Sequence, residues 1–128
     1  MIVVDTSAIL AILWEETESS LFRDRIAGAE SALISAATRL EAHIVCLKRR
    51  GLENVAALDL LLARLQVVTI PFDEHQFLLA RQAFSQYRQG RYGLNYGDCF
   101  SYALAKSRDL PLLFKGEDFS ATDVKRAL

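Results

Sequence analysis

The chain has 128 residues, of which 52% are hydrophobic and 24% are charged. This length suits one domain spanning residues 1–128, which can bury an apolar core without disulfides or a structural metal. The composition excludes a low-complexity protein, and the net charge of −1 lacks the basic excess common among nucleic-acid-binding domains. That charge is an average over the whole chain. If four acids were gathered in one metal site, the other residues would carry a net charge of +3.

We expect neither a membrane span nor a secretion signal from the sequence. Its longest uninterrupted apolar run, residues 8–14, is far shorter than the roughly 20 residues that a membrane helix requires. The first residues lead directly into an apolar strand without a basic segment, so no signal peptide is expected. We therefore expect a cytoplasmic protein.

Cysteine and histidine are too scarce to build a disulfide framework or a histidine-based metal site. Cys46 and Cys99 are expected to be small core residues, as befits isolated thiols in a reducing compartment. The histidines are His43 and His75 alone. Any bound metal is therefore expected to have oxygen ligands.

Short apolar runs alternate with longer helical patterns along the chain. Strands are predicted at 2–4, 32–35, 67–70 and 112–114, and helices at 7–14, 18–29, 36–50, 53–65, 73–87 and from 96 or 98 to 107. Connections too long for hairpins predict βαβ units, and hence an α/β fold with helices on both faces of a parallel sheet. Right-handed crossovers then bring the carboxyl ends of the strands together at one edge.

Three of the helices carry apolar side chains at helical spacing, which predicts a packed face on each. These side chains are Leu40, Ile44 and Leu47 in 36–50, Leu58, Leu61, Leu62 and Leu65 in 53–65, and Phe77, Ala80, Phe84 and Tyr87 in 73–87.

Four acids occupy related places in this pattern. Asp5 follows the first strand, Asp98 begins a helix, Asp118 follows the last strand, and Glu41 lies just over one turn into the helix after the second strand. Ligands of open α/β sheets bind in the crevice outside these strand ends. Each acid also has a plain structural alternative, since Asp5 and Asp98 suit helix caps, Asp118 suits a turn, and Glu41 suits an ion pair with Arg39 or Arg64.

Taken together, the four acids favour a cation site. Mg²⁺ and Mn²⁺ prefer oxygen ligands, and sites that cut phosphodiesters use such ions to activate water and to stabilise the leaving oxygen. A carboxylate beside the apolar face of a helix also needs a partner, because burying an unpaired charge is costly.

Four stretches resemble the PIN-domain ribonucleases, and more closely the VapC-type toxins of bacterial and archaeal toxin–antitoxin pairs. They are Met1-Ile-Val-Val-Asp-Thr-Ser-Ala8, Ala37-Thr-Arg-Leu-Glu-Ala42, Leu94-Asn-Tyr-Gly-Asp-Cys-Phe-Ser-Tyr-Ala-Leu-Ala105, and Leu112-Leu-Phe-Lys-Gly-Glu-Asp-Phe119 followed by Thr122-Asp123. The stretches span nearly the whole chain in the order that the family shows.

The resemblance implies a three-layer α/β/α fold with a mostly parallel central sheet, a homodimer, and Mg²⁺- or Mn²⁺-dependent endonucleolytic cleavage of RNA. A metal-activated water would attack the phosphate and leave 5′-phosphate and 3′-hydroxyl ends. The family also suggests tRNA as a substrate and an antitoxin protein as a partner. A segment of that antitoxin would enter the acidic groove, often with an arginine that reaches the carboxylates.

Carried over by position, Asp5, Glu41 and Asp98 match the three principal acids of the family, and Asp118 matches the usual fourth. Glu117 stands beside Asp118, so which of the two reaches the metal is open, with Asp118 ranked first. The residues expected to support the site are Thr6, Ser7, Glu117 and Thr122.

RNA would be guided by cations and aromatic rings near the groove, since cations meet phosphates and rings stack on unpaired bases. The candidates are Arg88, Arg91, Tyr92 and Tyr96, for which the alternative is an ordinary solvated turn.

The sequence is compatible with two other functions. A receiver-type phosphoacceptor domain is also a small α/β protein with acids at strand ends, and Lys115 would be its lysine near the last strand. It ranks lower because the first strand is not followed by paired acids and no middle strand ends in an acceptor Asp. The other alternative is a PIN-like module that binds RNA without cutting it.

Overall fold

Four short strands form one parallel sheet in the computed structural model, which describes residues 1–128. The strands are β1 (Ile2–Val4), β2 (Ala32–Ser35), β3 (Val67–Ile70) and β4 (Leu112–Leu113), in the order β3-β2-β1-β4. Every pairing is parallel, so the sheet is wholly parallel rather than mostly so. The predicted strands are confirmed, with the last one residue shorter than expected.

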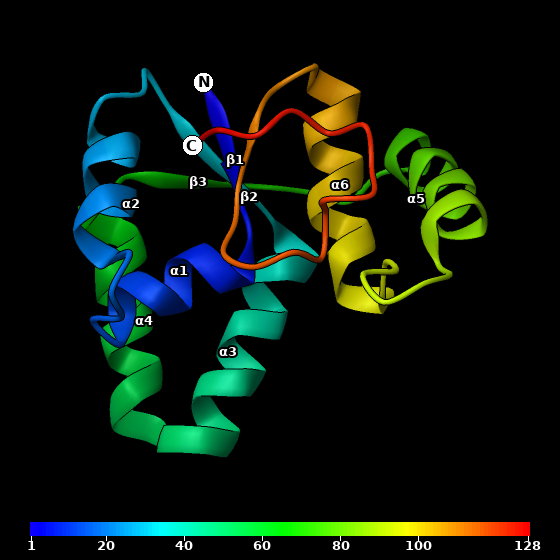
Figure 1. Cartoon of the computed structure of the whole chain (residues 1–128). Coiled ribbons are helices and arrows are strands. Elements are labelled where there is room, and N and C mark those ends of the chain that lie inside the picture. Colours follow the sequence, from blue (N-terminus) through cyan, green and yellow to red (C-terminus); the bar gives the residue numbers. More distant parts are fainter.

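Six helices surround the sheet: α1 (Thr6–Leu13), α2 (Ser19–Ala27), α3 (Ala36–Arg50), α4 (Leu52–Arg64), α5 (Glu74–Tyr87) and α6 (Tyr96–Arg108). Figure 1 shows α2 and α4 on one side of the sheet and α5 and α6 on the other, which gives the predicted three layers. Helices α1 and α3 begin at the carboxyl edge of the sheet, and the two chain termini lie at the opposite edge (Figure 1). None of the six helices combines the length and apolar character needed to cross a membrane.

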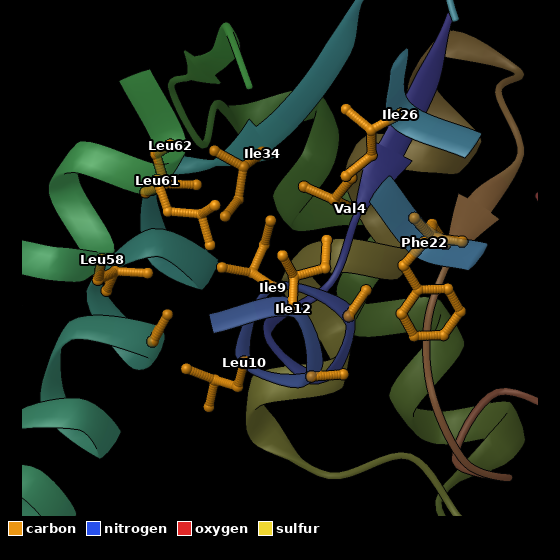
Figure 2. Close-up of a cluster of buried hydrophobic side chains, with 14 of the residues drawn as sticks. Val4, Ile9, Leu10, Ile12, Phe22, Ile26, Ile34, Leu58, Leu61 and Leu62 are labelled. Atoms are coloured by element: carbon orange, nitrogen blue, oxygen red, sulfur yellow. The ribbon is translucent and has the colours of Figure 1, made fainter. Parts of the chain in front are cut away.

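The two faces of the sheet belong to separate hydrophobic clusters, because successive side chains of a strand point to opposite faces. Ile2 and Val4 lie in a cluster with α1, α2 and α4, whereas Val3 lies in a second cluster with α6. Figure 2 shows the first cluster, in which Ile9 and Ile12 of α1 are fully buried. This double coverage explains why β1 and β2 read as uninterrupted apolar runs. Cys46 and Cys99 are buried free thiols, as predicted.

The predicted packing stripe of α3 is wrong, and that of α5 is right for Ala80 and Tyr87 but wrong for its two phenylalanines. Phe77 and Phe84 of α5 are 47% and 42% exposed, and Leu40 and Ile44 of α3 are 58% and 41% exposed. Helix α3 instead buries small side chains, which are Thr38, Ala42 and Cys46. Periodicity identifies residues that share a face but does not show whether this chain covers that face. Leu58, Leu61 and Leu62 of α4 are buried as predicted, and Leu65 is half-buried.

Candidate active site

The carboxyl edge of the sheet brings together segments that are distant in the sequence. Asp5 follows β1 and caps α1, Glu41 lies in the second turn of α3, and Asp98 lies in the first turn of α6. Asp118 lies in the loop after β4. The charges of the other three acids all act on Asp98, so the four form one electrostatic group.

Asp5 is 5% exposed and accepts hydrogen bonds on both carboxylate oxygens. Its Oδ2 accepts from the Ser7 backbone N–H at 3.1 Å and from Ser7 Oγ at 2.7 Å, which caps α1. Its Oδ1 accepts from Ser101 Oγ at 2.6 Å, and Ser101 Oγ also lies 3.1 Å from Thr38 Oγ1. These bonds fix the carboxylate plane without supplying a positive charge. Asp5 therefore caps α1, as its position suggested, and is also a member of the acidic group.

Glu41 is held by the residue that follows Asp5. Thr6 Oγ1 donates to Glu41 Oε1 at 2.6 Å. Burial raises the pKa of Glu41, the hydrogen bond from Thr6 lowers it, and the charge of Asp5 raises it further, with a net upward shift. On the other side lies Gly97, where an added Cβ would overlap the Glu41 carboxylate. Helix α6 can approach Glu41 this closely only because residue 97 has no side chain.

Asp98 begins α6 in a capping box with Asn95. The Asn95 backbone N–H donates to Asp98 Oδ2 at 3.1 Å, and the Asp98 backbone N–H donates to Asn95 Oδ1 at 2.9 Å. Burial raises the pKa of Asp98 to about 7; the Asn95 hydrogen bond opposes this shift, and the charges of Asp5, Asp118 and Glu41 add to it. Near neutral pH this carboxyl is therefore poised between its protonated and ionised forms.

The loop after β4 contributes one acid to this group. Asp118 is exposed, and its charge acts on Asp98. Glu117 is also exposed, and its carbonyl accepts from Ser120 Oγ at 2.6 Å. Thr122 Oγ1 donates to the Phe119 carbonyl at 2.8 Å within the same loop. Of these two acids, Asp118 is the one whose charge raises the pKa of Asp98, and the Thr122 hydroxyl lies in a local turn.

No cation of the protein compensates the acidic group. The ion pairs of the chain involve other acids, and the nearest lysine in sequence to Asp118, Lys115, pairs with Glu16 at 3.2 Å and Glu18 at 3.4 Å. Arg39 pairs with Asp59 rather than with Glu41. Buried, uncompensated carboxylates raise one another's pKa, and a bound cation would relieve that repulsion.

The donors at this edge are carboxylate and hydroxyl oxygens, the ligand type that Mg²⁺ and Mn²⁺ prefer. No three acidic, histidine or cysteine side chains lie close enough together to hold an ion as they stand. The carboxylates of Asp5, Glu41 and Asp98 each accept a hydrogen bond from a hydroxyl or a backbone N–H. The chemistry of this donor set fits a divalent ion.

Among the residues predicted to contact RNA, Tyr96 lies beside the acids. It is 79% exposed and lines a hollow of about 270 Å³ together with Glu41 and Gly97. Arg88, Arg91 and Tyr92 are exposed in the turn between α5 and α6, where the Arg91 guanidinium lies 5.3 Å from the centre of the Tyr92 ring.

Sequence reasoning missed several residues that shape the site, which are Thr38, Asn95, Gly97 and Ser101. Helical spacing could have found two of them, since Thr38 precedes Glu41 by three residues and Ser101 follows Asp98 by three. The need for glycine at 97 depends on how closely α3 and α6 approach, which only the folded structure reveals.

Comparison with known proteins identifies relatives over almost the full chain. The family model described as PIN domain matches residues 2–125. Ribonuclease VapC28 of Mycobacterium tuberculosis is 45% identical, with 98% of this chain and 97% of that protein covered. Ribonuclease VapC of Mycolicibacterium smegmatis is 47% identical, with 95% and 96% covered.

Solved structures share the fold at lower sequence identity. The crystal structure of VapC20 of Mycobacterium tuberculosis, described as a sarcin-ricin loop cleaving toxin, is 19% identical with a TM-score of 0.76 and covers 97% of this chain and 96% of its own. VapBC2 from Rickettsia felis, bound to a DNA fragment from its promoter, is 17% identical with a TM-score of 0.78. The match covers 98% of this chain and 96% of that chain.

Proposed function

This chain belongs to the PIN-domain family and, within it, to the VapC ribonucleases; from that premise we propose that it is the RNA-cleaving toxin of a toxin–antitoxin pair and acts in the cytoplasm. One observation carries the mechanism. Four acids from four segments form one group at the carboxyl edge of the sheet, and none of them has a cation partner within the chain. The receiver-type alternative loses support, because the family model covers nearly the whole chain and Lys115 pairs with Glu16 and Glu18.

Asp5, Glu41 and Asp98 would hold Mg²⁺ or Mn²⁺, with Asp118 completing the site. Bound there, a divalent ion supplies positive charge for the RNA phosphate and makes water a stronger nucleophile. The protein prepares the ligands: Ser7 and Ser101 orient Asp5, and Thr6 orients Glu41.

Ionisation of Asp98 is a condition for activity. The protonated carboxyl is a poor cation ligand, so ion binding competes with a proton at this residue. Because the pKa of Asp98 is about 7, more of the free protein has this carboxyl ionised as the pH rises through 7. The concentration of ion needed for half-maximal cleavage should therefore fall as the pH rises.

RNA would approach over Tyr96, with Arg88, Arg91 and Tyr92 contacting its backbone and bases. The exposed ring of Tyr96 borders the hollow that contains Glu41, so a base stacked on it would lie close to the acids. A tRNA is the first substrate to test.

The antitoxin would use the same negative charge. An arginine of its inserted segment would form charge-assisted hydrogen bonds with the carboxylates and so compete with the ion and with RNA. The likeness in fold to VapBC2 from Rickettsia felis and to a toxin–antitoxin complex from Klebsiella pneumoniae is consistent with such a partner.

A homodimer would explain the uncovered apolar side chains of α3 and α5. Ile44, Phe77 and Phe84 are 41%, 47% and 42% exposed. Apolar clusters on a protein surface mark interaction sites more often than solvated faces. A second copy of the chain is the partner that we assign to this surface.

The test is cleavage of total RNA and of tRNA by the wild type and by Asp5→Asn, with Mg²⁺ or Mn²⁺ and with EDTA. Asp59→Asn is the matched control, because it removes an exposed acid outside the site. We expect ion-dependent cleavage by the wild type and by Asp59→Asn, none in EDTA, and a loss of at least a hundredfold in Asp5→Asn. Equal cleavage by Asp5→Asn would overturn the assignment, and RNA binding without cleavage would favour the inactive module.

A further inference from the structure

The loop that carries Asp118 lies against α6, the helix that carries Asp98. Two apolar anchors attach this loop to the core: Phe119 and Val124 are 2% and 9% exposed. The Phe119 ring packs 4.9 Å from the ring of Phe114 at the end of β4. Backbone hydrogen bonds hold the end of the segment beside β4, where the Leu112 N–H donates to the Lys125 carbonyl at 2.8 Å and the Ala127 N–H donates to the Leu112 carbonyl at 2.9 Å.

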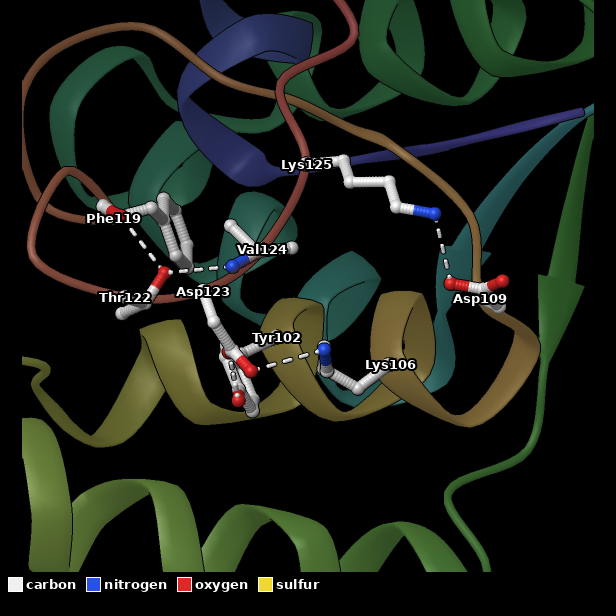
Figure 3. Close-up of polar contacts among 8 residues, drawn as sticks. All are labelled: Tyr102, Lys106, Asp109, Phe119, Thr122, Asp123, Val124 and Lys125. Carbon is white, nitrogen blue, oxygen red and sulfur yellow. Dashed lines mark hydrogen bonds and ion pairs between the residues drawn. The ribbon is translucent and has the colours of Figure 1, made fainter.

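A directional contact lies between the two anchors. Tyr102 of α6 is 6% exposed, and its hydroxyl donates to Asp123 Oδ1 at 2.5 Å. Lys106 Nζ lies 3.1 Å from Asp123 Oδ2. Figure 3 shows Tyr102 and Lys106 on α6 with Asp123 reaching down to both. The Tyr102 and Lys106 contacts lower the pKa of Asp123, so this carboxylate is charged at neutral pH.

The spacing of these contacts aligns the loop with the helix. Asp98, Tyr102 and Lys106 are separated by four residues each and therefore lie along one face of α6. The loop contacts this face through Asp123, which binds Tyr102. Asp118, five residues earlier in the same loop, carries a charge that acts on Asp98 one turn nearer the start of α6. Movement of Asp123 along the helix would move Asp118 relative to Asp98.

We propose that Asp123 is a positioning residue: by binding Tyr102 and Lys106 it holds Asp118 beside Asp98 and so raises the affinity of the acidic group for a divalent cation. This inference rests on the proposed function, because it takes the four acids to be the cation site. Asp123 itself is not a ligand in this account. Its hydrogen-bond partners are Tyr102 and Lys106, one and two turns beyond Asp98.

The same segment offers a matched control. Lys125 Nζ lies 3.1 Å from Asp109 Oδ1 at the C-terminal cap of α6, and Figure 3 shows this pair apart from the Asp123 contacts. Both side chains are largely exposed, at 67% and 83%. The pair connects the same loop to the same helix but lies beyond the stretch that aligns Asp118.

The experiment measures Mn²⁺ binding by calorimetry, together with the melting temperature in EDTA, for the wild type, Asp123→Asn, Tyr102→Phe and Lys125→Ala. We expect the Mn²⁺ dissociation constant to rise about tenfold in Asp123→Asn and Tyr102→Phe, the loss typical of residues that orient metal ligands. Lys125→Ala should bind as the wild type does. In an Asp118→Asn background, Asp123→Asn should cause little further loss, because both changes remove the same contribution.

Two results would overturn the inference: unchanged Mn²⁺ affinity in Asp123→Asn and Tyr102→Phe, or a full additional tenfold loss in the Asp118→Asn background. Tyr102→Phe removes one hydroxyl only, so it decides the matter even if Asp123→Asn does not fold. Cleavage of RNA by the same preparations separates the two claims. A wild type that cleaves RNA while Asp123→Asn binds Mn²⁺ normally contradicts this inference alone, whereas a wild type that binds Mn²⁺ but cuts no RNA contradicts the proposed function.

Discussion

Two acids of the site, Asp5 and Asp98, are held by hydrogen bonds that also serve the local backbone. Asp5 caps α1, and Asp98 closes the capping box of α6. Caps of this kind stabilise a helix by about 1 kcal/mol and fix the side chain in one rotamer. The protein thus orients two cation ligands with interactions that the helices need in any case.

The raised pKa of Asp98 predicts that the ion-free protein loses stability as the pH rises from about 4 to about 7. In this range the folded state keeps the proton, whereas the unfolded chain, with an ordinary aspartate pKa of about 3.9, has released it. The folded state therefore binds more protons, and its free energy of unfolding falls with increasing pH. Glu41, whose pKa is also raised, acts in the same direction.

Urea denaturation in EDTA at pH 5 and pH 8 measures this effect. The free energy of unfolding should be lower at pH 8, and Asp98→Asn should reduce the difference by about 1.4 kcal/mol for each pKa unit of the shift. Added Mn²⁺ should restore stability at pH 8 in the wild type but not in Asp98→Asn. An identical pH dependence in the two proteins would show that Asp98 titrates normally.

Gly97→Ala should reduce cleavage at least tenfold even though alanine favours helices by about 1 kcal/mol over glycine. The new Cβ would overlap the Glu41 carboxylate and displace either Glu41 or the first turn of α6. Gly28→Ala is the control, since its Cβ would meet only ordinary contacts at the end of α2. Full activity in Gly97→Ala would show that Glu41 need not lie where the structure has it.

Among the elements, α6 contributes most to the site. It presents Asp98, Gly97 and Ser101 from its first two turns, and Ser101 donates to Asp5 across the edge of the sheet. Ser101→Ala should destabilise the fold by about 1 kcal/mol and lower cleavage about tenfold, because a buried carboxylate oxygen loses its donor. Ser107→Ala is the control in the same helix, where the hydroxyl donates to the Leu104 carbonyl. Equal activities of the two variants would contradict the orienting role of Ser101.

The boundaries of these elements follow from local signals, which is why they could be predicted. Apolar runs with β-branched residues mark β1, β2 and β3, and Gly51 separates α3 from α4 at a φ of 82°. The placement of Asp5, Glu41 and Asp98 followed from the rule that the carboxyl ends of parallel strands share one edge.

Two aspects could not be predicted from one sequence, because they depend on tertiary contacts. The apolar residues of α3 and α5 have helical spacing, but Ile44 and Phe77 face outward. Helical spacing does not show whether another part of the chain covers that face. Hydrogen bonds such as Ser101 to Asp5 join residues 96 positions apart. Local patterns contain no information on pairs so distant.

At the scale of the whole molecule, the exposed apolar side chains of α3 and α5 predict a homodimer. Ile44→Lys should shift the protein to a monomer in light-scattering chromatography, because a charge would be buried at the interface. Leu52→Lys is the control, since Leu52 is 77% exposed and belongs to α4, outside the two helices that carry this surface. A wild type that is monomeric at high micromolar concentration would exclude the dimer.

The proposed function depends on the four acids acting as one cation site. The most direct measurement is a Mn²⁺ titration of the wild type and of Asp5→Asn, Glu41→Gln, Asp98→Asn and Asp118→Asn, with Asp59→Asn as the control. We expect each of the four variants to bind Mn²⁺ at least tenfold more weakly than the wild type and Asp59→Asn to bind it equally well. A wild type that binds no Mn²⁺, or four variants that bind it as tightly as the wild type, would contradict the proposed function.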